Sequence, residues 1–287
     1  MVFGASSLWA SDVQHTKLLR IDPKTNRVLA QIRIGKPLDF VDDQDQVDGW
    51  VAVGDGFVWA TDQWHNRVVR INPATNRVVA SIRVASPWDI AVSDGAVWVP
   101  QFEPYAVARI AEATNKIAKR IPATGPTAVA AGAGSIWVVM HRADEVIRVD
   151  PRTNTVIATI RRARAKSPER AFFLFGSLWV SDGNETHSLL RIDPASNRVV
   201  AVIKPPGSFF VNFLFAGGRW LWDVSPAGGV YKIDPATNRI VEQVHVDPPS
   251  KCGAPPAPQP CFFGAGYADG TVWAYDQVRQ AIIRISD

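Results

Sequence analysis

Cysteine is scarce in this chain, and so are long apolar runs. The sequence has only two Cys among 287 residues, which excludes a disulfide-rich scaffold and the repeated Cys/His spacing of structural zinc modules. The longest apolar stretches, such as 171–180, fall short of the roughly 20 residues that a membrane-spanning helix needs. The sequence therefore predicts no membrane span.

A large surplus of one charge is also missing. The 31 Lys and Arg residues against 27 Asp and Glu leave a net charge of +4, which is too small to hold a polyanion at physiological salt. We expect no specific nucleic-acid partner. Because 47% of the residues are hydrophobic and 20% are charged, the chain can bury a large core and is globular.

The chain starts with Met1 directly in repeat material, without the basic start and apolar stretch of a signal peptide. Cys252 and Cys261 flank a Pro-rich loop, and their spacing allows a loop-closing disulfide, although two unpaired thiols are the alternative. A disulfide favours an oxidising compartment. We therefore expect a secreted or cell-envelope protein whose signal segment is not present in this chain.

One motif, apolar-Trp-apolar, repeats along the whole sequence at spacings of 39 to 51 residues, a period typical of β-propellers. About eleven residues after each Trp comes an apolar strand with one basic residue. The Trp positions are Trp9, Trp59, Trp98, Trp137, Trp179, Trp222 and Trp273, and the basic ones are Arg20, Arg70, Arg109, Arg148, Arg191, Lys232 and Arg284. A large ring at one position of every second strand fits packing between blades.

Each unit contains four short strands rich in Val, Ile and aromatic residues, which form one antiparallel blade. Six units share a hairpin motif of the DPxTNR type, in which Asp caps the turn, Pro presets φ and Asn tolerates the left-handed conformation. The predicted fold is all-β, a seven-bladed β-propeller forming a single domain over 1–287. The approximate blades are 1–35, 50–85, 88–122, 127–162, 171–204, 210–247 and 262–286.

The last blade ends after its third strand, so the sequence predicts either three strands there or a closing strand supplied from upstream of Met1. Propellers often close by borrowing a terminal strand. We expect an N-terminal segment outside this chain.

The repeats resemble the YVTN and NHL-like propeller repeats. The segment 132–160, with GAGSIWV and VIRVDPRTNTVIATI, is similar to the streptogramin (virginiamycin B) lyase-like superfamily, and the resemblance spans the chain. It implies the propeller fold and, for an enzyme, elimination that opens a cyclic depsipeptide with Mg²⁺ and a histidine on one face. The matching residues are turn and packing positions, so the resemblance is specific for fold rather than activity.

Alternating strand direction places the loops between strands two and three, and the crossovers between blades, on one face. We name this top face the crossover face. Its loops vary in length over a regular scaffold, which is typical of functional loops. Four of the five histidines fall in these loops, and histidine suits proton transfer or metal binding. The candidate catalytic residues are His15, His65, His141 and His187, with solvated loop histidines as the alternative.

Three of these blades place an Asp three positions after the Trp and a His shortly beyond it. The pairs are Asp12 with His15, Asp62 with His65, and Asp182 with His187. The same loops offer apolar rings and polar anchors, a mixture that suits a ligand pocket. The candidate ligand-binding residues are Asp62, Trp64, Trp88, Phe102, Glu103, Tyr105, Arg142, Asp144 and Arg279.

The insertion at 35–49 carries closely spaced carboxylates that can wrap a hard cation, although their spacing does not match an EF-hand. The candidate metal ligands are Asp42, Asp43, Asp45 and Asp48, for Ca²⁺ or for the Mg²⁺ that the resemblance implies. No G-x-S-x-G or H-E-x-x-H motif occurs.

Two functions fit these features. The first is an exported binding module, a monomer whose crossover face holds a small-molecule, peptide or glycan ligand. The alternative is a streptogramin-lyase-like enzyme that performs elimination on a cyclic depsipeptide or related ester, with a crossover-face histidine as general base. A protein-binding scaffold is a third reading. An enzyme predicts at least one of the histidines within hydrogen-bond reach of a carboxylate or cation.

Overall fold

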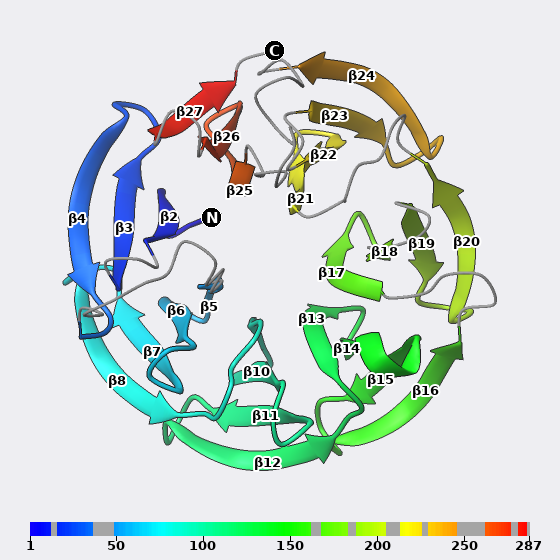
Figure 1. Cartoon of the computed structure of the whole chain (residues 1–287), viewed down its shortest axis with the longest axis horizontal. Coiled ribbons are helices and arrows are strands. Elements are labelled where there is room, and N and C mark those ends of the chain that lie inside the picture. The colour runs from blue at the N-terminus through cyan, green and yellow to red at the C-terminus, as the bar shows by residue number, and fades with distance from the viewer. Residues whose placement is uncertain are drawn as a thin grey trace, which may run out of the picture. The chain divides into compact units, whose positions relative to one another are not determined.

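Seven antiparallel sheets account for nearly all of the regular structure in the computed structural model, as Figure 1 shows. The structure describes residues 1–12, 16–36, 49–161, 168–182, 188–204, 213–225, 229–245, 262–276 and 281–285. The chain forms two compact units, Met1–Thr159 and Ile160–Asp287.

Unit 1 contains blades 1 to 4 except the last two residues of β16, and in each of these blades the strands pair in chain order. Blade 1 consists of β1 (Val2–Gly4), β2 (Ser7–Asp12), β3 (Lys17–Asp22) and β4 (Arg27–Arg33), and blade 2 of β5 (Val51–Gly54), β6 (Phe57–Asp62), β7 (Arg67–Asn72) and β8 (Arg77–Arg83). Blade 3 consists of β9 (Ala91–Ser93), β10 (Ala96–Gln101), β11 (Ala106–Ala111) and β12 (Lys116–Pro122). Blade 4 consists of β13 (Pro126–Gly132), β14 (Ser135–Met140), the 3₁₀ turn η1 (His141–Ala143), β15 (Glu145–Asp150) and β16 (Thr155–Arg161).

Unit 2 contains the remaining three blades. Blade 5 consists of β17 (Pro168–Leu174), β18 (Ser177–Asp182), β19 (Leu189–Asp193) and β20 (Arg198–Ile203). Blade 6 consists of β21 (Phe213–Gly217), β22 (Trp220–Val224), β23 (Gly229–Asp234) and β24 (Arg239–His245). Blade 7 has three described strands, β25 (Phe262–Ala268), β26 (Thr271–Asp276) and β27 (Ala281–Ile285).

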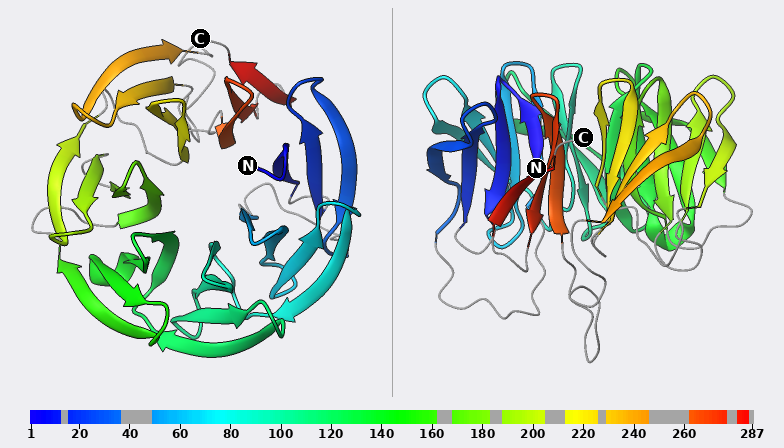
Figure 2. Two further views of the ribbon diagram at one scale, coloured as in Figure 1. Left: turned by 180° about the vertical axis from the view of Figure 1, so that it is seen from behind. Right: turned by 90° about the horizontal axis from the view of Figure 1, so that it is seen from above.

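These seven sheets confirm the predicted all-β, seven-bladed β-propeller, including a last blade of three described strands. Within unit 1, the first strands of successive blades contact one another, and β4, β8 and β12 form the outer side (Figure 1). The side view in Figure 2 shows the hairpin turns of these blades at the upper end. These turns join strand one to strand two and strand three to strand four. We name the opposite end of each blade, where strands two and three join and the crossovers run, its crossover end.

The repeated Trp residues are the centres of the core, since none is more than 4% exposed. Each Trp lies directly opposite the basic residue of the third strand, as in the pairs Trp9 with Arg20 and Trp179 with Arg191. In all seven blades the cation lies 4.7 to 5.7 Å from the ring centroid. This geometry is a cation–π contact in a largely dry setting.

The same guanidinium also joins neighbouring blades within a unit. Nη1 of Arg20 donates to the Pro73 carbonyl (2.5 Å) and to Asn76 Oδ1 (2.9 Å) on the hairpin of blade 2. In unit 2, Nη1 of Arg191 donates to the Pro235 carbonyl and to Asn238 Oδ1 at 2.6 and 3.0 Å. The hairpin Asn thus has a role beyond the turn.

The turn chemistry follows the sequence prediction. The Asn of all six hairpins has positive φ, between 54° and 60°. The leading Asp or Asn caps its own turn, since Asp22 Oδ1 accepts from the Lys24 amide and Asn72 Oδ1 from the Ala74 amide.

Replacing Arg20 with Ala should lower the free energy of unfolding by about 1–3 kcal/mol, because it removes the contact with Trp9 and the charged hydrogen bonds to blade 2. Urea denaturation measures this difference. Arg27→Ala, an exposed residue at the start of β4, is the control and should change stability by less than about 0.5 kcal/mol. Equal losses in the two variants would show that the contact does not stabilise the fold.

The carboxylate of Glu112, which bonds to Arg70, makes the stability of the fold depend on pH. It accepts from Arg70 Nη2 at 3.4 Å and is 8% exposed. Burial, followed by the neighbouring Asp55 carboxylate, raises the pKa of Glu112 to about 7, although Arg70 acts in the opposite direction. The folded state therefore retains a proton that the unfolded chain releases near pH 4.5.

This difference in proton binding should make stability fall as the pH rises from about 4.5 to about 7. Glu112→Gln has no such proton to release, so the variant should gain about 1–3 kcal/mol relative to the wild type across that window. Urea denaturation at a series of pH values checks this. Parallel pH profiles of the two proteins would rule it out.

Candidate functional site

Asp62 and His65 form a close pair at the crossover end of blade 2. Asp62 is the last residue of β6 and is buried, and His65 follows in the loop before β7. The ring nitrogen Nδ1 lies 2.9 Å from both carboxylate oxygens, and the His65 amide donates to Asp62 Oδ1 at 3.2 Å. Asp62 therefore holds both the loop backbone and the imidazole ring of His65 in place.

The end of blade 1 covers this pair from one side. Arg67 donates from Nε to Asp62 Oδ2 (2.8 Å) and from Nη2 to the Ile34 carbonyl (2.6 Å). A Cβ atom at Gly35 would lie 2.9 Å from Asp62 Oδ2 and from the His65 ring, so a glycine is needed for this close approach. The Asp62 side chain is only 4% exposed, while the His65 side chain remains 25% exposed.

The pair can act as a positioned base. A carboxylate beside Nδ1 favours the tautomer in which Nδ1 carries the proton, so Nε2 presents its lone pair. The oxygens of Asp62 already accept from His65 and Arg67. This carboxylate is therefore not an open ligand for the Mg²⁺ that the family resemblance implies.

A second group of predicted residues meets at the crossover ends of blades 3 and 4. Trp88 and Phe102 have ring centroids 5.4 Å apart, and Phe102 and Tyr105 pack edge to face at 5.8 Å. The Arg142 guanidinium carbon lies 5.4 Å from the Phe102 centroid and 5.2 Å from that of Tyr105. We name these four residues the aromatic–arginine cluster.

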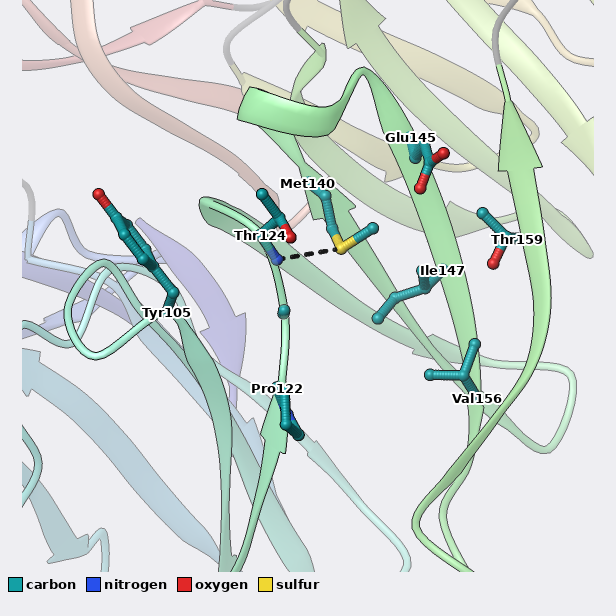
Figure 3. Close-up of a pocket in the computed structure, with 9 residues that line it drawn as sticks. Tyr105, Pro122, Thr124, Met140, Glu145, Ile147, Val156 and Thr159 are labelled. Carbon is teal, nitrogen blue, oxygen red and sulfur yellow. Dashed lines mark hydrogen bonds between the residues drawn. The ribbon is translucent and has the colours of Figure 1, made fainter.

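A cavity of about 460 Å³ shares Tyr105 with this cluster. Figure 3 shows the residues that line it. Blade 3 contributes Tyr105 and the segment 122–124 to its walls. Blade 4 contributes Met140, Glu145, Ile147, Val156 and Thr159. The Thr124 amide donates to Met140 Sδ at 3.4 Å and joins the two walls. We name it the blade 3–4 cavity.

The other predicted residues lie in the loops around these two groups. His141 lies in η1 on blade 4, where its amide donates to the Gly125 carbonyl at 2.9 Å, and Asp144 ends η1 with φ of 53°. Glu103 is exposed and precedes a cis proline. Trp64 is half-buried beside His65.

Several candidates lie outside the described residues. These are the catalytic candidates His15 and His187, the ligand candidate Arg279, the metal candidates Asp42, Asp43, Asp45 and Asp48, and the disulfide candidates Cys252 and Cys261. In the part of the chain that the structure describes, no three His, Cys, Asp or Glu side chains gather closely enough to hold a metal ion. No helix in that part is long and apolar enough to cross a membrane.

Solved structures with the same fold carry the names of different enzymes. A streptogramin B lyase matches with a TM-score of 0.76 and 14% identity over 95% of this chain and 88% of its own. A catalytically inactive virginiamycin B lyase from Staphylococcus aureus, solved with quinupristin, matches with a TM-score of 0.69 and 16% identity over 86% of each chain. Hydrazine synthase from Kuenenia stuttgartiensis matches with a TM-score of 0.77 and 12% identity over 100% of this chain and 94% of its own.

At these identities the likeness is one of fold, and it confirms the propeller that the family resemblance implies. No protein-family model and no curated protein matches the sequence. The site must therefore be judged from its own residues.

Sequence reasoning missed one unusual acid in blade 6. Asp223 is fully buried, and burial raises its pKa well above the usual range. Burial, and next the Asp223 charge, raise the pKa of the facing Tyr231 to about 12. The signal was present in the sequence, because Asp223 follows the blade Trp where other blades have Ala or Val.

Proposed function

We propose that this protein is a ligand-binding β-propeller whose crossover-end loops hold a small molecule, peptide or glycan. The observation that carries the proposal is the aromatic–arginine cluster beside the blade 3–4 cavity. Three separate loops contribute its rings and its cation. Small-molecule sites combine a concave apolar surface of about 300–1,000 Å³ with a few polar groups, and this arrangement has both.

The cluster should tolerate substitution without loss of the fold, since Phe102 is only half-buried and lies in a loop. In a thermal-shift screen of small molecules, peptides and glycans, a ligand of the native state raises the melting temperature. Phe102→Ala should abolish most of that shift and weaken binding by about tenfold. Isothermal titration measures the affinity.

Phe175→Ala is the matched control. Phe175 is another Phe outside the strands, with 40% of its surface exposed, but it lies in the hairpin between β17 and β18. It should leave the ligand response unchanged. Equal loss of binding in both variants would place the ligand elsewhere, and a flat response to the whole panel would favour a scaffold with a protein partner.

A second function has its own support. The 2.9 Å contact between His65 and Asp62 is the geometry expected of a general base and its orienting carboxylate. The lyases of similar fold make a streptogramin-lyase-like elimination the natural reaction class to test. In that reaction His65 Nε2 would take the proton from the carbon next to a carbonyl. A C=C bond would form to the adjacent carbon as the C–O bond there breaks, and the acyl group would leave as a carboxylate.

Incubation with a cyclic depsipeptide, followed by mass spectrometry, tests this function. We expect a linear product from the wild type, and a loss of about 100-fold or more in His65→Gln. Gly35→Ala, which would press against the ring without touching substrate, should also lower the rate. Turnover that survives in His65→Gln, or no turnover in the wild type with divalent cations supplied, would count against this enzyme.

We also propose that the protein is exported, on the strength of the two Cys that flank the Pro-rich loop. A disulfide between Cys252 and Cys261 should protect both thiols from alkylation until the protein is reduced. Alkylation of both Cys in the unreduced native protein would contradict the disulfide.

A further inference from the structure

The outer strands of blades 1 to 3 carry charge of one sign. β4, β8 and β12 contain seven Lys and Arg residues and no Asp or Glu, although the whole chain has a net charge of only +4. All seven basic residues are exposed. In the described part of the chain, no ion pair joins any of them to a carboxylate. The seven are Arg27, Arg33, Arg77, Arg83, Lys116, Lys119 and Arg120.

A β-bulge in each of the first two outer strands adds apolar surface. In β4 the ladder with β3 passes from Val28 to Ala30 and leaves Leu29 without a cross-strand partner. The same shift in β8 leaves out Val79. A bulge re-aims side chains, and Val28, Leu29 and Val79 are each more than half exposed. We name these three apolar residues and the seven basic residues the basic–apolar wall.

This wall does not suit a second copy of the same chain. Two such edges would bring like charges together, which repel. Basic side chains and bulges on an edge strand are also devices that keep strands of neighbouring molecules from pairing. A partner of the wall must therefore be anionic.

The apolar residues distinguish between anionic partners. A nucleic acid or an acidic sugar chain would satisfy the cations but would leave Leu29 and Val79 without apolar contacts. A flat lipid surface could reach only part of the wall, because β4, β8 and β12 follow the outer side of unit 1 from blade to blade (Figure 1). A flexible polypeptide with both acidic and apolar side chains matches the charge, the apolar surface and the curvature.

We propose that the basic–apolar wall binds an extended acidic segment of a partner protein, whose apolar side chains cover Leu29 and Val79. Arg77 and Arg83 lie on either side of Val79 in one strand, roughly 20 Å apart. A guanidinium can donate two parallel hydrogen bonds to a carboxylate, which supplies orientation as well as affinity. The wall uses neither the aromatic–arginine cluster nor the Asp62–His65 pair, so this inference goes beyond the ligand-binding function.

Three labelled peptides of about 16 residues test the proposal by fluorescence anisotropy with the whole protein. Their repeating units are Glu-Ser-Leu-Ser, Glu-Ser-Ser-Ser and Lys-Ser-Leu-Ser. The Glu–Leu peptide should bind about tenfold tighter than the Leu-free peptide, and the Lys peptide should not bind. Added salt should weaken the binding of the Glu–Leu peptide, because exposed charges are screened.

Reversing two charges of the wall should reverse the preference for charge. Arg33→Glu combined with Arg83→Glu should weaken the Glu–Leu peptide by about tenfold or more and should allow the Lys peptide to bind. The matched control is Arg152→Glu combined with Arg219→Glu, at two exposed hairpin positions outside the wall. It changes the net charge equally and should leave the affinity unchanged.

A second double variant tests the apolar residues. Leu29→Ser combined with Val79→Ser should remove the preference for the Glu–Leu peptide over the Leu-free peptide. Because both side chains are exposed, the melting temperature should stay the same, which shows that the fold is intact.

Equal binding of the two acidic peptides to the wild type would overturn the proposed partner, since charge alone would then explain binding. Binding that is lost in Phe102→Ala but survives in the Arg33/Arg83 variant would place the peptide at the crossover ends and would also overturn the proposal. Binding of phosphatidylserine vesicles, without binding of any peptide, would identify a lipid surface instead. A complete lack of peptide binding would reject the wall as a protein-binding surface and leave the proposed small-molecule site untouched.

Discussion

The contact between the Trp of the second strand and the basic residue of the third strand is the interaction on which each blade depends. The two residues are direct cross-strand partners, so the contact sets the register of the ladder while it buries the ring. The arginine then extends beyond its own sheet to the hairpin of the next blade, as Arg20 does to Asn76. Arg20 thus covers the buried Trp9 ring, pairs across the strands with it and attaches blade 1 to blade 2.

The Trp–Arg contacts and the hairpins they reach lie away from the crossover ends of the blades. At blades 2, 3 and 6 the hairpin motif also receives the arginine of the preceding blade, which is Arg20, Arg70 or Arg191. In unit 1 the crossover ends carry two groups of different chemistry: a positioned imidazole at blade 2, and rings with a stacked cation at blades 3 and 4. Similar folds that carry lyase and hydrazine synthase names illustrate how loosely activity follows this scaffold.

Glycine allows both groups to form. At Gly35 and Gly125 the backbone approaches a candidate side chain so closely that any Cβ atom would displace it. In one case the backbone lies against Asp62 and the His65 ring, and in the other it lies against the stem of Arg142. Each contact joins neighbouring blades, so blade packing also orients these side chains.

The sequence alone determined the class of fold, the number of blades and the hairpin conformation, because these depend on short-range patterns: a Trp period near 40, alternating strands and an Asn that adopts positive φ. It also placed His65 beside Asp62, since only Gln63 and Trp64 separate them. Only the tertiary structure decided that Gly35 covers this pair, that Arg142 stacks on Phe102 and Tyr105, and that a cavity opens beside them. Those contacts join residues of different blades, whose relative placement depends on packing rather than on any local sequence pattern.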